Sequence, residues 1–390
     1  MPNVTERPPA ESALDQSDKI PVFVPCIGVD TLKHLTDALD VGWLGMGATT
    51  KEFEERIASY LGGGRNVVCT NTGTSALHIA CLAAGLGPGD EVITPSFNYV
   101  ADHQAVRATG ASVVMCDIND DDLGVDIASA EALIGPRTKA IIPLHFSGIP
   151  CRSAEVYALA KRHGLRVIED GCHAFGSTID GAKIGSSGDL ACFSFDPVKI
   201  ITSIDGGCVV TSSAEEVDRL QHYRLLGVDK DTTLRYKNKR AWDYDVVSEG
   251  YRYHLTNIMA SIGVSQIKRI DEFIASRQAV CTRYSAAFDG IAGLRVLRRS
   301  YADVSPFIYS LRVTGGRREA LIEHLTARNV EVGIHFVPVH RHTYFAGARR
   351  SPMPVTERVV DEVLTLPLHS LMKEAHVQRV IDGVRSFFDS

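Results

Sequence analysis

Short apolar runs alternate with longer amphipathic stretches along most of the chain. The apolar runs are bounded by glycine or polar residues, which is typical of strands, and the stretches between them carry apolar residues at helical spacing. Phe53, Ile57 and Leu61 illustrate the helical spacing. This alternation predicts an α/β fold. The expected strands of the first part of the chain lie at residues 66–69, 91–95, 113–117, 139–145, 165–168 and 190–195.

The expected helices follow the same pattern, and one of them is expected to start within residues 96–101. The others lie at residues 29–40, 50–61, 215–226, 259–288, 319–327 and 375–387, and an Ala/Leu-rich helix follows residues 70–77. Two further strands are expected at 308–313 and 330–336. A chain of 390 residues exceeds a typical single core, so we expect more than one domain. The expected division is a disordered tail at 1–19, a large domain at 20–265 and a small α+β domain at 266–390.

The residues with the clearest chemistry lie between Val167 and Val210. One strand-like run ends in Glu169-Asp170 and the next ends at Ser194 and Phe195, and the edge of an α/β sheet is where such enzymes place their chemistry. Lys199 is the single charged residue from position 197 to 204. A desolvated lysine amine forms Schiff bases, and a buried carboxylate can keep a pyridinium nitrogen protonated. Together these residues suggest pyridoxal 5'-phosphate (PLP), although either one alone is more often a surface lysine or a helix cap.

Four motifs in this region occur in the order found in one known family. EDGCHAFG, GD, FSFDPVK and DGG resemble the DegT/DnrJ/EryC1/StrS family of PLP-dependent sugar aminotransferases, and the resemblance extends from about Ile20 onward. It implies an aspartate-aminotransferase-like fold (PLP fold type I), with a mostly parallel seven-stranded sheet in a large PLP-binding domain and a smaller C-terminal domain. It also implies a homodimer whose active sites are shared between subunits.

The resemblance assigns roles to individual residues. Lys199 would bind PLP covalently and act as general acid and base, and Asp170 would pair with the pyridinium nitrogen. The other implied cofactor contacts are Gly73, Thr74, Ser75, Tyr99, His173, Ser194 and Arg252. The implied substrate contacts are Trp43, His335 and His340.

Several of these assignments compete with simpler interpretations. The turn before Ser75 on its own favours a capped helix, whereas the resemblance favours a phosphate cradle. Tyr99 and Trp43 can also be read as packing aromatics. Arg252 stands where the family has an asparagine that reaches the PLP phosphate of the partner subunit, so it binds either that phosphate or a substrate phosphate. The basic loop at 230–240 is either solvated or an anion site. The histidines of 333–340 lack a third ligand, so we expect no metal.

The implied reaction is transfer of an amino group from L-glutamate to a nucleotide-linked keto sugar. Our first choice of substrate is the C4 ketone of a dTDP- or GDP-4-keto-6-deoxyhexose, because the GYxYxxTN and HFxPxH segments resemble those of C4 enzymes. Other keto sugars, including C3 ketones, remain open. A PLP sugar dehydratase is disfavoured because relatives of that kind replace the lysine with histidine. A non-catalytic PLP-binding regulator is disfavoured because neither end has room for a DNA-binding module.

Composition and charge limit the partners. The formal charge of −6 argues against a general nucleic-acid or membrane-surface partner. No apolar run approaches the roughly 18 residues that span a bilayer, and the first 19 residues lack the apolar core of a signal peptide. Nine cysteines are scattered without a CxxC pair, which indicates reduced thiols in the cytoplasm. Cys172, beside Asp170, is either a reactive thiol or a packing residue.

Overall fold

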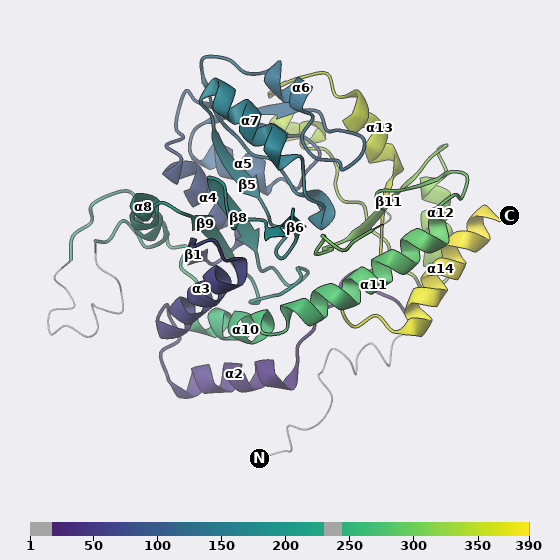
Figure 1. Cartoon of the computed structure of the whole chain (residues 1–390), viewed down its shortest axis with the longest axis horizontal. Helices are drawn as coiled ribbons and strands as arrows, with labels where there is room; N and C mark the ends of the chain where they lie inside the picture. The colour runs from purple at the N-terminus through teal and green to yellow at the C-terminus, as the bar shows by residue number, and fades with distance from the viewer. Residues whose placement is uncertain (1–17, 230–243, 299, 390) are drawn as a thin grey trace.

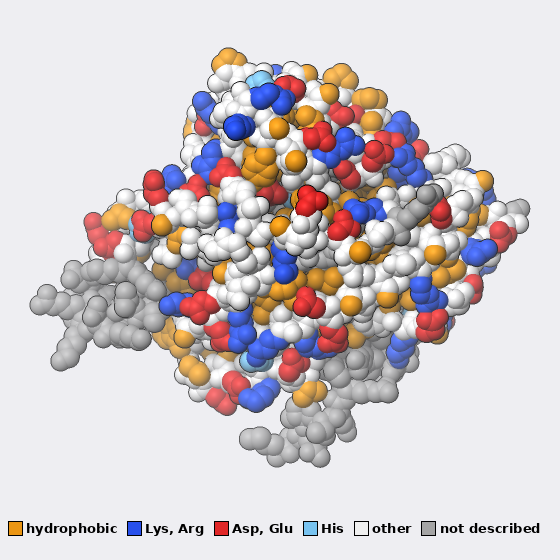
Figure 2. Space-filling model, viewed as in Figure 1, with side chains coloured by type: hydrophobic (Ala, Val, Ile, Leu, Met, Phe, Trp, Pro, Cys, Tyr) orange, Lys and Arg blue, Asp and Glu red, His pale blue; other side chains and the backbone are white. Residues whose placement is uncertain are grey.

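The computed structural model describes residues 18–229, 244–298 and 300–389. The chain forms a large α/β domain and then a smaller domain that contains the C-terminus (Figure 1). The expected tail at 1–19 falls almost entirely outside the described residues, and so does the basic loop at 230–240. On the face seen in Figure 2, Lys and Arg side chains are interspersed with Asp and Glu.

A mostly parallel sheet forms the centre of the large domain. Its strand order is β1-β9-β8-β5-β4-β2-β3-β12, and β9 is antiparallel to both of its neighbours. The predicted α/β fold with a mostly parallel sheet is confirmed, and the two-residue β12 adds a short edge strand to the seven strands expected. The strands are β1 (Asn66–Thr70), β2 (Glu91–Pro95), β3 (Ser112–Cys116), β4 (Thr138–Ile141), β5 (Arg166–Asp170), β8 (Leu190–Ser194), β9 (Gly207–Thr211) and β12 (Arg349–Arg350).

Helices cover both faces of this sheet because successive strand residues are apolar, so that both faces carry apolar side chains. Leu190 and Cys192 of β8 pack on one face with residues of α4, α5 and α8, whereas Ala191 and Phe193 pack on the other face. α3 and α10 cover the second face beside β8, and α6 and α7 cover it farther along. The helices are α2 (Val29–Asp40), α3 (Ala48–Leu61), α4 (Gly73–Ala83), α5 (Ala101–Ala108), α6 (Ile127–Glu131), α7 (Ser153–His163), α8 (Ala214–Arg224) and α10 (Asn257–Ile267).

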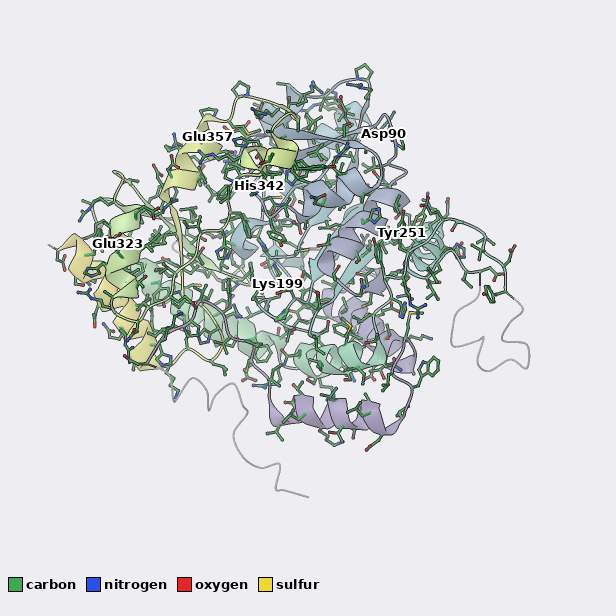
Figure 3. All side chains as sticks on the ribbon, turned by 180° about the vertical axis from the view of Figure 1, so that it is seen from behind. Asp90, Lys199, Tyr251, Glu323, His342 and Glu357 are labelled. Carbon is green, nitrogen blue, oxygen red and sulfur yellow. The ribbon has the colours of Figure 1, made fainter. Side chains whose placement is uncertain are left out.

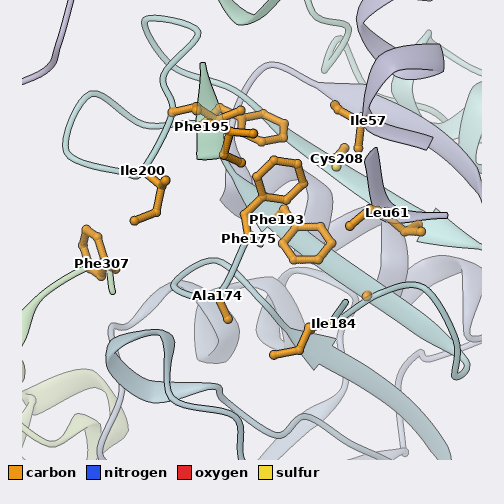
Figure 4. Close-up of a cluster of buried hydrophobic side chains, with 14 of the residues drawn as sticks. Ile57, Leu61, Ala174, Phe175, Ile184, Phe193, Phe195, Ile200, Cys208 and Phe307 are labelled. Atoms are coloured by element: carbon orange, nitrogen blue, oxygen red, sulfur yellow. The ribbon is translucent and has the colours of Figure 1, made fainter. Parts of the chain in front are cut away.

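An aromatic cluster fixes the end of β8 from which the lysine segment starts. Phe175 lies edge-on to Phe193 and Phe195, with ring centroids 5.1 and 5.4 Å apart (Figure 4). Phe53 of α3 packs against Phe195 at 5.2 Å. Such fully buried rings contribute large apolar area, and removing one costs about 3–5 kcal/mol. The residues just after β8 are therefore held by a rigid core.

The smaller domain is an antiparallel three-stranded sheet with helices packed on it. The long helix α11 runs from the large domain into the small one (Figure 1). The chain then returns to the large sheet, where Arg349 and Arg350 pair with β3. The predicted boundary between 265 and 266 stays a prediction. The elements of this part are α11 (Ile270–Phe288), β10 (Leu294–Val296), β11 (Tyr309–Val313), α12 (Arg318–Thr326), α13 (Pro354–Glu362), β13 (Val363–Leu366) and α14 (Glu374–Phe388). A short separate hairpin, β6 (Thr178–Ile179) and β7 (Ala182–Lys183), lies between β5 and β8 in the sequence.

The helix expected to start within 96–101 begins at Ala101, the last position of that range, because the Asn98 side chain accepts the Tyr99 N–H at 2.6 Å and competes with helical bonding before it. Two other local expectations differ from the structure. The expected strand at 330–336 forms only isolated bridges, at Val330 and Gly333, since the chain crosses between domains there. The helix expected at 259–288 is two helices with a break at 268–269.

No helix within the described ranges combines the length and apolar character needed to cross a membrane.

Candidate active site

A cavity of about 360 Å³ opens at the carboxyl ends of β5 and β8, where it meets segments of the small domain. Figure 3 shows Lys199 near the middle of the molecule. The cavity combines hydroxyl, carboxyl and amine groups on the side of the sheet with aromatic rings on the side of the small domain. Its lining consists of Phe23, Thr72, Gly73, Thr74, Leu77, Asn98, Tyr99, Ala101, Asp170, Cys172, His173, Ser194, Asp196, Val198, Lys199, Asp205, Phe307, His335 and Phe336.

Lys199 reaches this cavity from a tight turn that follows β8. The Asp196 carboxylate accepts the Val198 N–H at 3.0 Å, and the Asp196 carbonyl accepts the Lys199 N–H at 3.0 Å. Burial lowers the pKa of the Lys199 amine, although the neighbouring Cys172, Asp170 and Asp196 oppose that effect. An amine with a lowered pKa is more often neutral and therefore nucleophilic. The turn thus presents a reactive amine to the cavity.

Asp170 is the last residue of β5 and lies deep in the cavity. It is 5% exposed, and its Oδ1 accepts the backbone N–H of Cys172 at 2.9 Å. The amide of Asn98 approaches its Oδ2 at 3.5 Å. A buried carboxylate with few donors has capacity left for a further cationic or N–H partner. Asp170 can therefore pair with a cationic ring nitrogen.

The start of α4 forms a concave anion site beside β8. The Thr72 hydroxyl accepts the Ser75 N–H at 2.9 Å and caps the helix, which leaves its first backbone N–H groups without intrahelical partners. A Cβ on Gly73 would lie 2.7 Å from the Ser194 Cβ, so only glycine permits this close approach. Gly73, Thr74 and Ser194 line the cavity. The site fits a phosphate group.

Ser75 points away from the cavity despite its place in the same turn. Its hydroxyl contacts Asn71 Oδ1 at 2.7 Å and Thr72 Oγ1 at 2.8 Å. The capped-helix interpretation of this turn is confirmed. The phosphate cradle stays a prediction, which the cap allows because it leaves the N–H groups of the first turn available.

Aromatic rings form the opposite wall of the cavity. His173 stacks on Phe307, with ring centroids 4.5 Å apart, and on Phe336 at 5.7 Å. The ring centroids of Tyr99 and Phe336 are 5.7 Å apart, and Tyr99 is 57% exposed, so it stands at the cavity mouth. Burial, and then the Lys199 charge, hold the pKa of His173 well below its usual range. His173 is therefore neutral at physiological pH.

His335 adds a second neutral imidazole to this wall. Its Nδ1 lies 2.9 Å from the Thr365 hydroxyl, and burial together with the Lys199 charge lowers its pKa to about 4. Lys199 is the one Lys or Arg among the described residues that line the cavity, whereas Asp196 and Asp205 add carboxylates. Burial and the Asp196 charge raise the pKa of Asp205. The described lining is thus poor in groups that bind anionic substrates.

Three other predicted residues lie outside this lining. Trp43 is 40% exposed, and its indole N–H donates to the Met46 carbonyl at 2.9 Å. His340 is held between the Ser96 hydroxyl and Glu357, at 2.7 Å from each. Arg252 is exposed in a segment that pairs with Leu225, and its neighbour Tyr251 lies well away from Lys199 (Figure 3).

The structure adds residues that the motifs did not indicate. Asn98 lies in the loop between β2 and α5 and contacts Asp170. Phe307 and Phe336 come from the small domain, far along the chain from Lys199. The position of Asn98 after an apolar strand was a usable signal, since β2 ends at the same sheet edge as β5. Phe336 belongs to the HFxPxH segment, in which only the two histidines were assigned a role, and nothing in the sequence marks Phe307.

These residues fit PLP. The first turn of α4 offers backbone N–H groups to a phosphate, and the Asp170 carboxylate and the Lys199 amine lie within the same cavity. In addition, His173 Nδ1 is buried with no hydrogen-bond partner among the described residues, so a bound polar group would satisfy it. The donor set therefore matches a flat, anionic pyridine cofactor.

Comparisons with known proteins point to the same chemistry. A family model described as the DegT/DnrJ/EryC1/StrS aminotransferase family matches residues 25–385. The spore coat polysaccharide biosynthesis protein SpsC of Bacillus subtilis (strain 168) is 34% identical over 384 residues, which is 94% of this chain and 96% of that protein.

Two solved structures show the same fold over nearly the whole chain. The sugar aminotransferase CalS13 from Micromonospora echinospora is 29% identical, with a TM-score of 0.86 over 94% of this chain and 99% of that one. Spr1654 from Streptococcus pneumoniae in its PLP form is 28% identical, with a TM-score of 0.87 over 95% of this chain and 99% of that one.

Proposed function

Because the chain belongs to the DegT/DnrJ/EryC1/StrS aminotransferase family, we propose that it moves the amino group of L-glutamate to a nucleotide-linked keto sugar. It is a PLP-dependent transaminase of a sugar aminotransferase family. The finer proposal is amination at C4 of a dTDP- or GDP-4-keto-6-deoxyhexose. The observation that carries the proposal is the buried Lys199 amine, in one cavity with Asp170 and the N-terminus of α4.

Bound PLP supplies an electron sink that stabilises a carbanion next to the transferred nitrogen. Lys199 would hold the cofactor covalently through its amine, and when that amine is free it would act as the general acid and base. Its lowered pKa suits both tasks, because the neutral form is the nucleophile and the base.

The other residues hold and orient the cofactor. Asp170 keeps the ring nitrogen protonated, and the phosphate binds to the backbone N–H groups of Gly73 and Thr74 and to the Ser194 hydroxyl. The neutral His173 and, at the mouth of the cavity, Tyr99 would supply aromatic surface for a flat ring. Phe307 and Phe336 exclude water from the reacting groups.

We also propose that the enzyme is a cytoplasmic homodimer with shared active sites. L-glutamate carries two carboxylates and a nucleotide sugar carries a diphosphate, whereas Lys199 is the one Lys or Arg in the described lining. Bidentate binding of such anions favours arginine. We propose that the partner subunit supplies this positive charge, with Arg252 as the candidate, and that Trp43 and His335 contact substrate. The His340 ring is held by Ser96 and Glu357, so we propose that it acts on the substrate indirectly, by positioning its neighbours.

Two half-reactions, each followed by the visible absorbance of the bound cofactor, test the proposal. Purified PLP enzyme is mixed with L-glutamate, and the visible band of the bound cofactor is expected to disappear. The amino form is then offered a panel of nucleotide-linked keto sugars that differ in nucleotide and in ketone position. Return of the visible band with a C4 ketone and not with a C3 ketone supports the proposed carbon, and the reverse overturns it. A visible band that persists with glutamate argues against the donor.

A further inference from the structure

Asp102 is a second carboxyl group placed directly behind Asp170. It belongs to the first turn of α5 and is 0% exposed, and it is not part of the cavity lining. Its Oδ2 accepts the Asn98 amide at 2.6 Å, and the same amide nitrogen lies 3.5 Å from Asp170 Oδ2. One amide thus connects two buried carboxyl groups.

The Asp102 Oδ1 atom has no hydrogen-bond partner within the described residues. A buried carboxylate oxygen without a donor is costly, but a protonated carboxyl oxygen becomes a donor and needs an acceptor. Asp170 is the neighbouring group that offers one. We propose that Asp102 is a positioning residue, which stays protonated and donates a hydrogen bond to the Asp170 carboxylate.

The surroundings of Asp102 favour its neutral form. Burial raises the pKa of Asp102 well above its ordinary value, the Asp170 charge raises it further, and the Asn98 amide opposes both effects. The other titratable groups facing it are the buried thiols of Cys81 on α4 and Cys192 on β8, whose pKa values burial also raises. The N-terminal end of α5 favours an anion by only about 0.3–1 kcal/mol, which is small against burial beside a like charge.

This arrangement gives the pair one negative charge and one proton. Within the described residues Asp170 receives the Cys172 N–H and a long contact from the Asn98 amide, whereas Asp102 receives the Asn98 amide alone, so the donors favour the charge on Asp170 and the proton on Asp102. A buried carboxylate that loses a donor takes up a proton more readily, and a protonated Asp170 cannot hold a cationic ring nitrogen. Asp102 therefore acts on the cofactor through Asp170. This consequence alone rests on the proposed function, in which Asp170 pairs with the ring nitrogen of PLP.

Two substitutions of similar volume separate the explanations. Asp102→Asn keeps an N–H donor toward Asp170 and removes the acid, whereas Asp102→Leu removes the donor. We expect Asp102→Asn to bind PLP within about threefold of the wild type at pH 7, and Asp102→Leu to bind at least about tenfold more weakly, as expected for a lost hydrogen bond to a charged group. The loss in Asp102→Leu should shrink as pH rises. Equal losses in both variants would overturn the proposal, since packing or charge would then explain them.

The protonation state is measured separately on the apoenzyme. The infrared difference spectrum of wild type minus Asp102→Asn at pH 7 should contain the carbonyl stretch of a protonated carboxylic acid. Asp218→Asn is the control, because the Asp218 side chain is 71% exposed. If the band is absent, Asp102 is ionised and the proposal fails. This result does not depend on PLP or on any substrate, so it remains decisive even if the proposed reaction with glutamate is not observed.

Discussion

The Lys199 amine lies 3.9 Å from the centroid of the Phe307 ring. The ring precedes β11 of the small domain, so the packing of this segment against the large domain completes the environment of the lysine. An aromatic face attracts the charged amine, whereas burial under the same ring favours the neutral amine. The pKa of Lys199 is lowered overall, mainly by burial, so exclusion of water dominates.

Phe307→Ala should therefore raise the pH at which Lys199 reacts with PLP. Removing the ring admits water to the amine and restores its charge at neutral pH, and we expect the midpoint of the pH–rate profile for apoenzyme reconstitution to rise by about 1. Reconstitution is followed by the visible absorbance of bound PLP.

Phe307→Leu is the matched control for that prediction. Leucine keeps the apolar cover and lacks the aromatic face, so its midpoint should stay at or below the wild-type value. A rise equal to that of Phe307→Ala would contradict the prediction, because leucine keeps the apolar cover and loss of the aromatic face can only lower the pKa of the lysine.

Lys199→Ala should abolish turnover and still bind PLP. The phosphate site at Gly73 and the carboxylate of Asp170 remain in this variant, whereas the group that carries the proton is lost, which costs about 10³-fold or more in rate. Binding is measured by dialysis against PLP and turnover by amino-sugar formation. Transamination at a normal rate would show that another residue attaches the cofactor.

Arg252→Ala tests whether one subunit completes the site of the other. A charge-assisted contact to phosphate contributes about 1.5–3 kcal/mol, so we expect a roughly tenfold to hundredfold rise in KM for the nucleotide sugar or in Kd for PLP. An isolated surface arginine would have almost no effect.

Mixed dimers then distinguish a contact within one subunit from a contact across the interface. A heterodimer of Arg252→Ala and Lys199→Ala subunits has one site with both wild-type residues if Arg252 acts on the partner. Activity should therefore return on mixing. Heterodimers that form and stay inactive would place the role of Arg252 within its own subunit.

The outline of this site could be predicted from sequence because its main groups stand at strand ends. Asp170 closes β5 and Lys199 follows β8, and apolar strands with polar ends are visible as a pattern along the chain. The cradle at Gly73 was readable for the same reason, since it joins a strand to a helix. In these cases local sequence determines both the element and the direction of the side chain.

The remaining groups depend on contacts between distant segments. Phe307 lies against Lys199, and Phe336 lies against His173, only through the packing of distant segments. Phe307 stands in no pattern that differs from that of ordinary core phenylalanines, and the HFxPxH segment does not show which ring Phe336 faces. Asp102 reads as an ordinary acidic residue in a first helical turn, and only the fold places it behind Asp170. Arg252 was singled out by its motif, but a contact with a partner subunit cannot be read from the motif alone.

Asp120 should hold the small domain against the large one. It precedes α6, and its carboxylate binds Arg295, Arg312 and Arg358, which belong to β10, β11 and α13. Arg312 is only 2% exposed, so removing its partner leaves a buried charge less well paired. We expect Asp120→Ala to lower the free energy of unfolding by about 2–4 kcal/mol.

Asp120→Asn is the comparison for this prediction, since it keeps the shape and loses the charge, and it should cost less than alanine. Both are measured by denaturant unfolding of the apoenzyme. A loss below about 1 kcal/mol for Asp120→Ala would mean that the ion cluster behaves as an ordinary surface pair.

His369 should make the protein sensitive to acid. Its ring is 1% exposed, and both ring nitrogens lack hydrogen-bond partners among the described residues. Burial, then the Arg277 charge and that of His376, lower the pKa of His369 to about 3. The folded pKa is thus below the unfolded value of about 6.5, so below pH 6.5 the unfolded chain binds a proton that the native state does not. The stability that His369 contributes as a neutral ring is present above pH 6.5 and is lost as pH falls toward 3.

His369→Leu should remove this part of the acid response. Between pH 7 and pH 5 the wild-type apoenzyme should lose about 2 kcal/mol more of its free energy of unfolding than the variant loses. The reason is that the variant, which lacks the His369 ring, takes up one proton fewer when it unfolds. His342→Asn, at an exposed position, is the control and should follow the wild type. Denaturant unfolding curves at the two pH values provide the measurement. Parallel losses in the wild type and in His369→Leu would show that His369 is protonated in the native state or hydrated by water.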